Sequence, residues 1–178
     1  MVQTARPDAD DTDGSWTDKD GGTTLYTSID DTSTGDDATT YIKSADQGSN
    51  DVCIVRLSDV SAPATSGTYI KYKALTEDNM GMGQPGLKLE LLQGSSVKAT
   101  TTNSSVNTSS FTAYSYTISD VSGISDWTDL KMRITMITNA GANDLMKVTQ
   151  VYLETQDAGG ASVPIAAISM NTYRQMRN

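Results

Sequence analysis

The side chains that could carry out catalysis are scarce in this chain. It contains no histidine, a single cysteine and only three glutamates. Without histidine there is no imidazole acid–base catalysis, no serine or cysteine triad of the usual kind, and no histidine-ligated metal. A single cysteine excludes an internal disulfide. Cys53 lies between Val52 and Ile54, which predicts a small buried apolar side chain and not a reactive thiolate.

Carboxylates could support glycoside hydrolysis or calcium binding. Glycosidases place two carboxylates in one cleft, and Glu90 and Glu154 are candidates by residue type. Glu90 alternates with leucines, which predicts a solvated position, and no Glu-x-Asp-x-x-Glu motif is present. Aspartates at 8, 10, 11 and 13 resemble calcium ligands, but Thr12 breaks the Asp-x-Asp-x-Asp-Gly spacing. We therefore expect a solvated acidic turn, with no metal and no cofactor, and keep a calcium loop as the alternative.

Aromatic side chains could bind sugars, because sugar rings stack on exposed aromatic rings. The chain has two tryptophans, Trp16 and Trp127, and eight tyrosines. Trp127 precedes a strongly apolar run that begins at Leu130, a position typical of a residue that closes one end of a β-sandwich core. Trp16 could close the opposite edge in the same way. We predict core or edge packing for both, with glycan stacking on Trp16 and Trp127 as the alternative.

Short β-prone runs, separated by Gly, Pro, Asn, Asp and Ser, fill the middle of the chain. These runs are Leu25–Ile29, Thr39–Lys43, Val52–Leu57, Tyr69–Leu75, Leu87–Leu91, Val97–Thr102, Phe111–Ile118, Leu130–Met136 and Met146–Leu153. Eight or nine strands with no convincing helix among them predict an all-β fold. The expected architecture is a two-sheet antiparallel β-sandwich of the jelly-roll type, over residues 21–155.

The two ends differ in composition from this domain. Residues 1–20 are acidic and poor in apolar side chains, which predicts an N-terminal arm or loop. Residues 156–178 contain the hinge Gly159-Gly160 and then apolar and basic side chains that could share one helical face. This tail either docks on a partner or folds back on its own sandwich. Its candidate docking residues are Ile165, Ile168, Tyr173, Arg174, Met176 and Arg177.

Charge and hydropathy exclude two classes of partner. The net charge of −9 and the lack of a basic patch argue against nucleic acid. The longest apolar stretch, residues 163–168, is interrupted by Pro164 and is too short to cross a bilayer. The N-terminal residues lack the apolar core of a signal peptide. We therefore expect no membrane partner and synthesis in the cytoplasm.

Seven segments follow one another in a familiar order. They are Ser15-Trp16, Leu25–Asp30, Tyr41-Ile42, Val55–Pro63, Tyr69–Lys73, Leu87–Gly94 and Trp127–Ile134. This succession resembles the small jelly-roll proteins encoded among the structural genes of tailed bacteriophages. The matching motifs are structural and not catalytic, so the resemblance implies a virion protein without enzymatic activity.

Two main roles follow from the resemblance. The leading one is a head decoration (cement) protein on the outside of the shell, with the major capsid protein or another virion protein as its partner. The alternative is a tail-fibre or adhesin module that binds a host glycan. The short chain, without repeats or a coiled-coil stalk, favours decoration. The resemblance also implies a homotrimer and a location in the virion after synthesis in the host cytoplasm.

Overall fold

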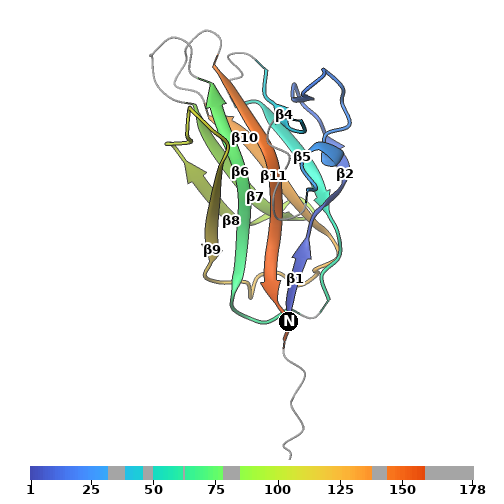
Figure 1. Ribbon diagram of the computed structural model, residues 1–178. Helices are drawn as coiled ribbons and strands as arrows, with labels where there is room; N and C mark the ends of the chain where they lie inside the picture. The colour runs from blue at the N-terminus through green and yellow to red at the C-terminus, as the bar shows by residue number, and fades with distance from the viewer. Residues whose placement is uncertain (32–38, 46–49, 62, 78–84, 138–143, 159–178) are drawn as a thin grey trace, which may run out of the picture.

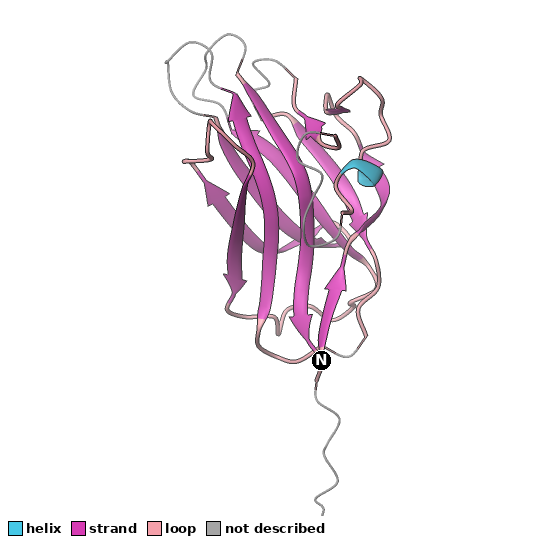
Figure 2. Cartoon of the chain, in the orientation of Figure 1, coloured by secondary structure: helices cyan, strands magenta, loops and turns pink. Residues whose placement is uncertain are grey.

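Two antiparallel β-sheets packed face to face make up the structure, a computed structural model that describes residues 1–31, 39–45, 50–61, 63–77, 85–137 and 144–158. Strands dominate it, and a short 3-10 helix, η1 (Tyr26–Ser28), is the one helix drawn in Figure 2. The architecture confirms the predicted jelly-roll β-sandwich. No helix of the described residues has the length and apolar character needed to cross a membrane.

The strands divide between two sheets, which we call sheet A and sheet B (Figure 1). Sheet A has the order β3-β4-β11-β6-β9, and β1 also pairs with β11. Its strands are β1 (Val2–Ala5), β3 (Thr17–Asp18), β4 (Ile42–Lys43), β6 (Thr68–Glu77), β9 (Thr112–Ile118) and β11 (Leu145–Gln156). Sheet B has the order β2-β5-β10-β7-β8. Its strands are β2 (Pro7–Thr12), β5 (Val52–Leu57), β7 (Gly86–Gln93), β8 (Ser96–Asn103) and β10 (Leu130–Ile137).

Side-chain alternation builds the core between the sheets. In β6, Ile70, Tyr72 and Ala74 are buried, whereas Lys71 and Lys73 between them are half-buried. Successive side chains of a strand point to opposite faces, so the apolar set of β6 lines the interior and the lysines lie on the outer face of sheet A. The central strand β10 of sheet B contributes alternate buried side chains in the same way. Full burial of each aliphatic side chain contributes about 1.5–3 kcal/mol.

The prediction of a strand over Leu25–Ile29 is wrong. This run contains η1 instead, and Leu25 and Ile29 are both completely buried. A spacing of four residues suits one face of a helical turn as well as one face of a strand. The carboxylate of Asp10 decides between them: its two oxygens accept hydrogen bonds from the backbone N–H groups of Leu25 (2.9 Å) and Tyr26 (2.8 Å), which fixes the start of the turn.

The N-terminal arm predicted for residues 1–20 is also wrong, because most of this segment is paired in the sheets. β1 pairs with β11, β2 with β5 and β3 with β4. Several of the acidic side chains have specific partners. Asp10 holds η1, and the carboxylate of Asp11 pairs with Lys131 at 2.8 Å. An acidic segment can therefore form ordered strands here, because hydrogen bonds to backbone N–H groups and an ion pair with a lysine stabilise its carboxylates.

Replacing Asp10 with alanine is expected to lower the free energy of unfolding by about 1–2 kcal/mol, because two backbone N–H groups would lose a charged acceptor. Asp8→Ala is the matched control, since the side chain of Asp8 is exposed and should change stability by less than about 0.5 kcal/mol. Urea unfolding of both variants measures the difference. Equal losses would show that the Asp10 carboxylate does not hold η1.

Candidate functional site

The predicted docking tail lies outside the described residues. This applies to all six candidate docking residues: Ile165, Ile168, Tyr173, Arg174, Met176 and Arg177. The tail stays a prediction. The last described residues, Asp157 and Ala158, follow β11, and the backbone N–H of Asp157 donates to the carbonyl of Met1 at 2.7 Å.

The two tryptophans occupy different environments. Trp16 is 1% exposed and belongs to the core, so it offers no ring face to a sugar and the stacking alternative is excluded for it. Trp127 is half-buried and packs against the core from its edge. Its backbone carbonyl accepts a hydrogen bond from the N–H of Val60 at 3.2 Å, which joins the loop before β10 to the end of β5.

Glu90 and Glu154 do not form a catalytic pair, because Glu90 lies on sheet B and Glu154 on sheet A. Glu90 is not solvated as predicted: it is 7% exposed. Its Oε2 accepts a hydrogen bond from Arg133 Nε at 2.7 Å and lies 3.3 Å from Lys88 Nζ. The hydrogen bond to Arg133 lowers the pKa of Glu90, and this outweighs the opposing effect of burial. The cross-strand pairing of Glu90 with Arg133 explains how a carboxylate can be covered on an outer face.

The cysteine and the N-terminal aspartates are described by the structure. Cys53 is completely buried, and burial, with the nearby Asp51, Asp10 and Asp13 carboxylates, raises the pKa of its thiol. A thiol in such surroundings is a poor nucleophile. Within the described ranges, no group of three or more His, Cys, Asp and Glu side chains is placed to hold a metal ion.

A shallow hollow of about 290 Å³ lies on the outer face of sheet A, and we call it the outer-face hollow. Its depth comes from side-chain size. Ala113 and Ser115 of β9 are small and lie opposite Lys73 and Lys71 of β6 in the strand register. The residues that line the hollow are Lys71, Tyr72, Ala113, Tyr114, Ser115, Gln150 and Tyr152. Three adjacent strands, β9, β6 and β11, therefore contribute to one surface.

The polar groups of the outer-face hollow are held in place by neighbours. The guanidinium carbon of Arg6 lies 5.0 Å from the centre of the Tyr152 ring, within the range of a cation–π contact. Lys71 Nζ lies 2.7 Å from Glu154 Oε1, and this hydrogen bond raises the pKa of Lys71. Gln150 Nε2 donates to the carbonyl of Asp31 at 2.9 Å. The hollow thus combines an oriented aromatic ring with ammonium and hydroxyl groups, and the Gln150 amide beside them is buried.

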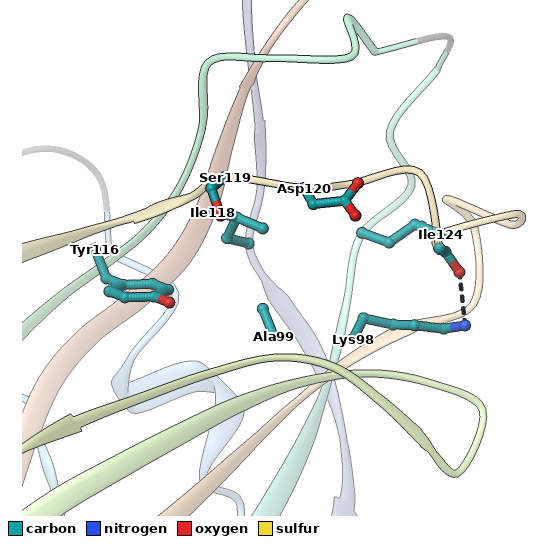
Figure 3. A pocket seen from close by; sticks show the side chains of 8 residues that line it. Lys98, Ala99, Tyr116, Ile118, Ser119, Asp120 and Ile124 are labelled. Atoms are coloured by element: carbon teal, nitrogen blue, oxygen red, sulfur yellow. Dashed lines mark hydrogen bonds between the residues drawn. The ribbon is translucent and has the colours of Figure 1, made fainter.

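A second hollow of about 240 Å³ opens at the side of the sandwich, between β8 and β9, and we call it the edge hollow (Figure 3). Its apolar wall is formed by Ala99, Ile118 and Ile124, and Tyr116 borders it with a side chain that is 37% exposed. Lys98 Nζ donates to the carbonyl of Gly123 at 2.6 Å, the contact dashed in Figure 3. The inner faces of two edge strands therefore remain partly open to solvent.

Sequence reasoning did not single out Tyr152, Gln150 or Tyr116. A signal for Tyr152 and Gln150 exists in the spacing of the apolar residues in β11. Met146 and Val148 are two apart, whereas Val151 follows Val148 by three. The extra residue is a β-bulge between Val148 and Gln150, and it changes which side chains face outward. A jump from two to three in an alternating pattern therefore marks Gln150 and Tyr152 as outer-face residues.

Comparisons with known proteins give structural likeness only. No protein-family model matches the chain, and no curated protein does. Among solved structures, the xylan-binding module CBM15 is 9% identical, with 89% of this chain and 99% of that chain covered and a TM-score of 0.48. A structure titled "CBM4 structure and function" is 13% identical over 66% of this chain and 72% of that chain (TM-score 0.44). A cyclase from Fischerella is 14% identical over 90% of this chain and 100% of that chain (TM-score 0.41). At identities this low the likeness concerns the fold alone.

Proposed function

We propose that this chain is a non-catalytic β-sandwich domain that binds a carbohydrate in the outer-face hollow. The observation that supports it most is the Tyr152 ring, fixed by Arg6 beside a depression with a floor of small side chains. Sugars bind through stacking of their C–H faces on aromatic rings and through hydrogen bonds to planar polar groups. Tyr152 supplies the ring, and Lys71 and Ser115 supply hydrogen-bonding groups around it.

The charge of this surface defines which carbohydrates fit. Arg6 and Lys71 lie beside the hollow, and Glu154 is the carboxylate paired with Lys71. The Lys71–Glu154 pair presents a donor and an acceptor close together, which suits vicinal hydroxyl groups of a neutral sugar. Within this proposal the ligand is an oligosaccharide bound across β11, β6 and β9, with one ring stacked on Tyr152.

The virion role follows from the sequence resemblance alone. Head decoration, the major capsid protein as partner, the homotrimer and the location in the virion stay predictions on that basis. Of the two roles that the resemblance implies, glycan binding is the one for which the described residues supply a site. A tail-fibre or adhesin module would use the outer-face hollow directly, whereas the docking tail needed for decoration lies among residues 159–178, outside the described part.

Tyr152→Ala is expected to weaken oligosaccharide binding at least about tenfold, equivalent to about 1.4 kcal/mol, through loss of ring stacking. A glycan array of the wild-type chain identifies a ligand, and calorimetric titration with the soluble, monovalent oligosaccharide measures affinity. Circular dichroism checks that the variant stays folded.

Tyr116→Ala is the matched control, because it removes a tyrosine at the edge hollow and should leave affinity unchanged. Loss of binding on Tyr116→Ala but not on Tyr152→Ala would move the site to the edge hollow. An array without any specific ligand would contradict the proposal itself.

A further inference from the structure

The strands that border the two sheets are β1, β3 and β9 in sheet A and β2 and β8 in sheet B, and they differ in how well they resist pairing with another strand. An edge strand presents unpaired backbone N–H and C=O groups, and proteins protect such edges with charges, proline, bulges or short length. β2 has Pro7, several aspartates and two register shifts. β8 has Lys98 and a register shift. β3 and β1 are short, with two and four residues.

β9 has none of these protections. Its sequence, Thr-Ala-Tyr-Ser-Tyr-Thr-Ile, contains no charged residue and no proline, and its register with β6 is unbroken from Thr112 to Ile118. On its other side it forms the border of sheet A (Figure 1). Within the described residues, no backbone–backbone hydrogen bond reaches β9 from anywhere but β6. Ala113, Ser115, Tyr116 and Thr117 are exposed, as expected for a strand with one uncovered side.

The chemistry of this edge suits a partner strand, and its neutral sequence lets a second copy of the chain approach there. A net charge of −9 opposes self-association over most of the surface, whereas β9 itself is neutral. When a twofold axis relates two identical edges, the unpaired N–H and C=O groups of each edge can bond to those of the other, and no further copy can join at this contact. A central position for the axis is Ser115, which has three strand residues on either side.

We propose that β9 pairs with β9 of a second copy, antiparallel and with Ser115 opposite Ser115, to join two copies of sheet A into one continuous sheet. In this register Tyr114 of each copy lies opposite Tyr116 of the other, and Ala113 opposite Thr117. Tyr114 and Tyr116 share the inner face of sheet A, because they are register partners of the buried Tyr72 and Ile70. Cross-strand aromatic pairs of this kind stabilise antiparallel sheets.

The edge hollow gives this pairing an apolar component. Tyr116 borders the hollow with its ring partly exposed, next to Ile118 and Ala99 (Figure 3). The Tyr114 of a second copy, placed opposite Tyr116, would cover this open side. The contact forms a dimer, in contrast to the trimer that the phage resemblance implies, and it does not depend on carbohydrate binding.

The register can be tested by disulfide cross-linking of the full chain. Directly opposite residues in an antiparallel pair have Cα atoms about 4.5–5.5 Å apart, which lies within the range that a disulfide can bridge. Ser115→Cys should form a covalent dimer under mild oxidation, and Cys53 adds no background because it is completely buried. Thr100→Cys is the matched control: Thr100 is also an exposed residue of an edge strand, but on β8. We expect at least about tenfold more dimer from Ser115→Cys.

A charge test examines the same contact without a new covalent bond. Thr117→Lys should raise the dimer dissociation constant at least about tenfold in light scattering or ultracentrifugation, because it places a cation on the edge. Adding Ala113→Asp should restore dimerisation, since residues 113 and 117 of the two copies lie opposite each other in the proposed register. A wild-type chain that stays monomeric, a threefold mass, or equal cross-linking of the two cysteine variants would overturn the proposal.

Discussion

Trp16→Ala is expected to lower the free energy of unfolding by about 3–5 kcal/mol, the range measured when a large buried aromatic side chain is truncated. Trp16 is 1% exposed and belongs to the same buried cluster as residues of both sheets. Its backbone N–H donates to the carbonyl of Asp13 at 3.1 Å, so the turn that precedes β3 holds the ring in place. Removal of the indole would leave a cavity that rigid neighbouring strands can fill only in part.

Two further variants test whether the loss of unfolding free energy comes from the burial of Trp16 and not from tryptophan as a residue type. Trp127→Ala removes the same side chain from a half-buried position at the edge of the core, and we expect a smaller loss of about 1–2 kcal/mol. Trp16→Phe should lose less than Trp16→Ala, because it keeps an aromatic ring and removes Nε1, which is buried and has no hydrogen-bond partner in the described structure. Equal losses for Trp16→Ala and Trp127→Ala in urea unfolding would show that Trp16 does not occupy the core.

Glu90→Gln is expected to lower the free energy of unfolding by about 2–3 kcal/mol at neutral pH, because Arg133 and Lys88 would face a neutral amide in a covered position. Glu154→Gln is the matched control. Its carboxylate pairs with Lys71 on a more exposed surface, where such pairs contribute only about 0–1 kcal/mol. Similar losses of unfolding free energy for the two variants would show that the burial of Glu90 adds nothing to its pairing with Arg133 and Lys88.

The contribution of Glu90 also predicts a dependence on pH. The pKa of Glu90 is lower in the folded chain than in the unfolded one, where it is about 4.3. The unfolded state therefore binds a proton first as the pH falls. The stabilisation is fully present above the unfolded pKa and is lost as the pH falls through the folded pKa. In urea unfolding below about pH 4, the difference between the wild-type chain and Glu90→Gln should shrink. A difference that is constant from neutral to acid pH would contradict this assignment.

The alternation of apolar and polar residues predicts the central strands closely. The sequence does not show which strands pair when they are far apart along the chain. β5 matches its predicted range, Val52–Leu57. β6 extends its predicted run by three residues and β10 by one, because apolar side chains alternate with polar ones that are less buried. The N-terminal strands escaped prediction since their partners, β5 and β11, are far away in the sequence and their own apolar content is low. The prediction that Glu90 is solvated is wrong because Arg133, which pairs with it, belongs to another strand.

The candidate site was less predictable than the fold. The outer-face hollow depends on a β-bulge in β11 and on two small residues of β9, and these features come together only when the strands are paired. Tyr152 is one tyrosine among eight in the sequence, and only the change of spacing in β11 distinguishes it from Tyr72, which is buried. The exposure of Tyr116 depends on β9 lying at the border of sheet A, which is a property of strand order and not of residue type.

The pairing of β1 with β11 has a mechanical consequence. The start of β1 lies beside the end of β11, with Val2 opposite Gln156 (Figure 1). Force that pulls these two ends apart would break the rungs of this ladder one at a time, as in a zipper, and would release β1 first. Force applied between the end of β11 and a ligand held on the neighbouring β6 would run along the strands and load many of the hydrogen bonds between β11 and β6 together. The domain should therefore resist tension between the end of β11 and a bound ligand better than tension between its two ends.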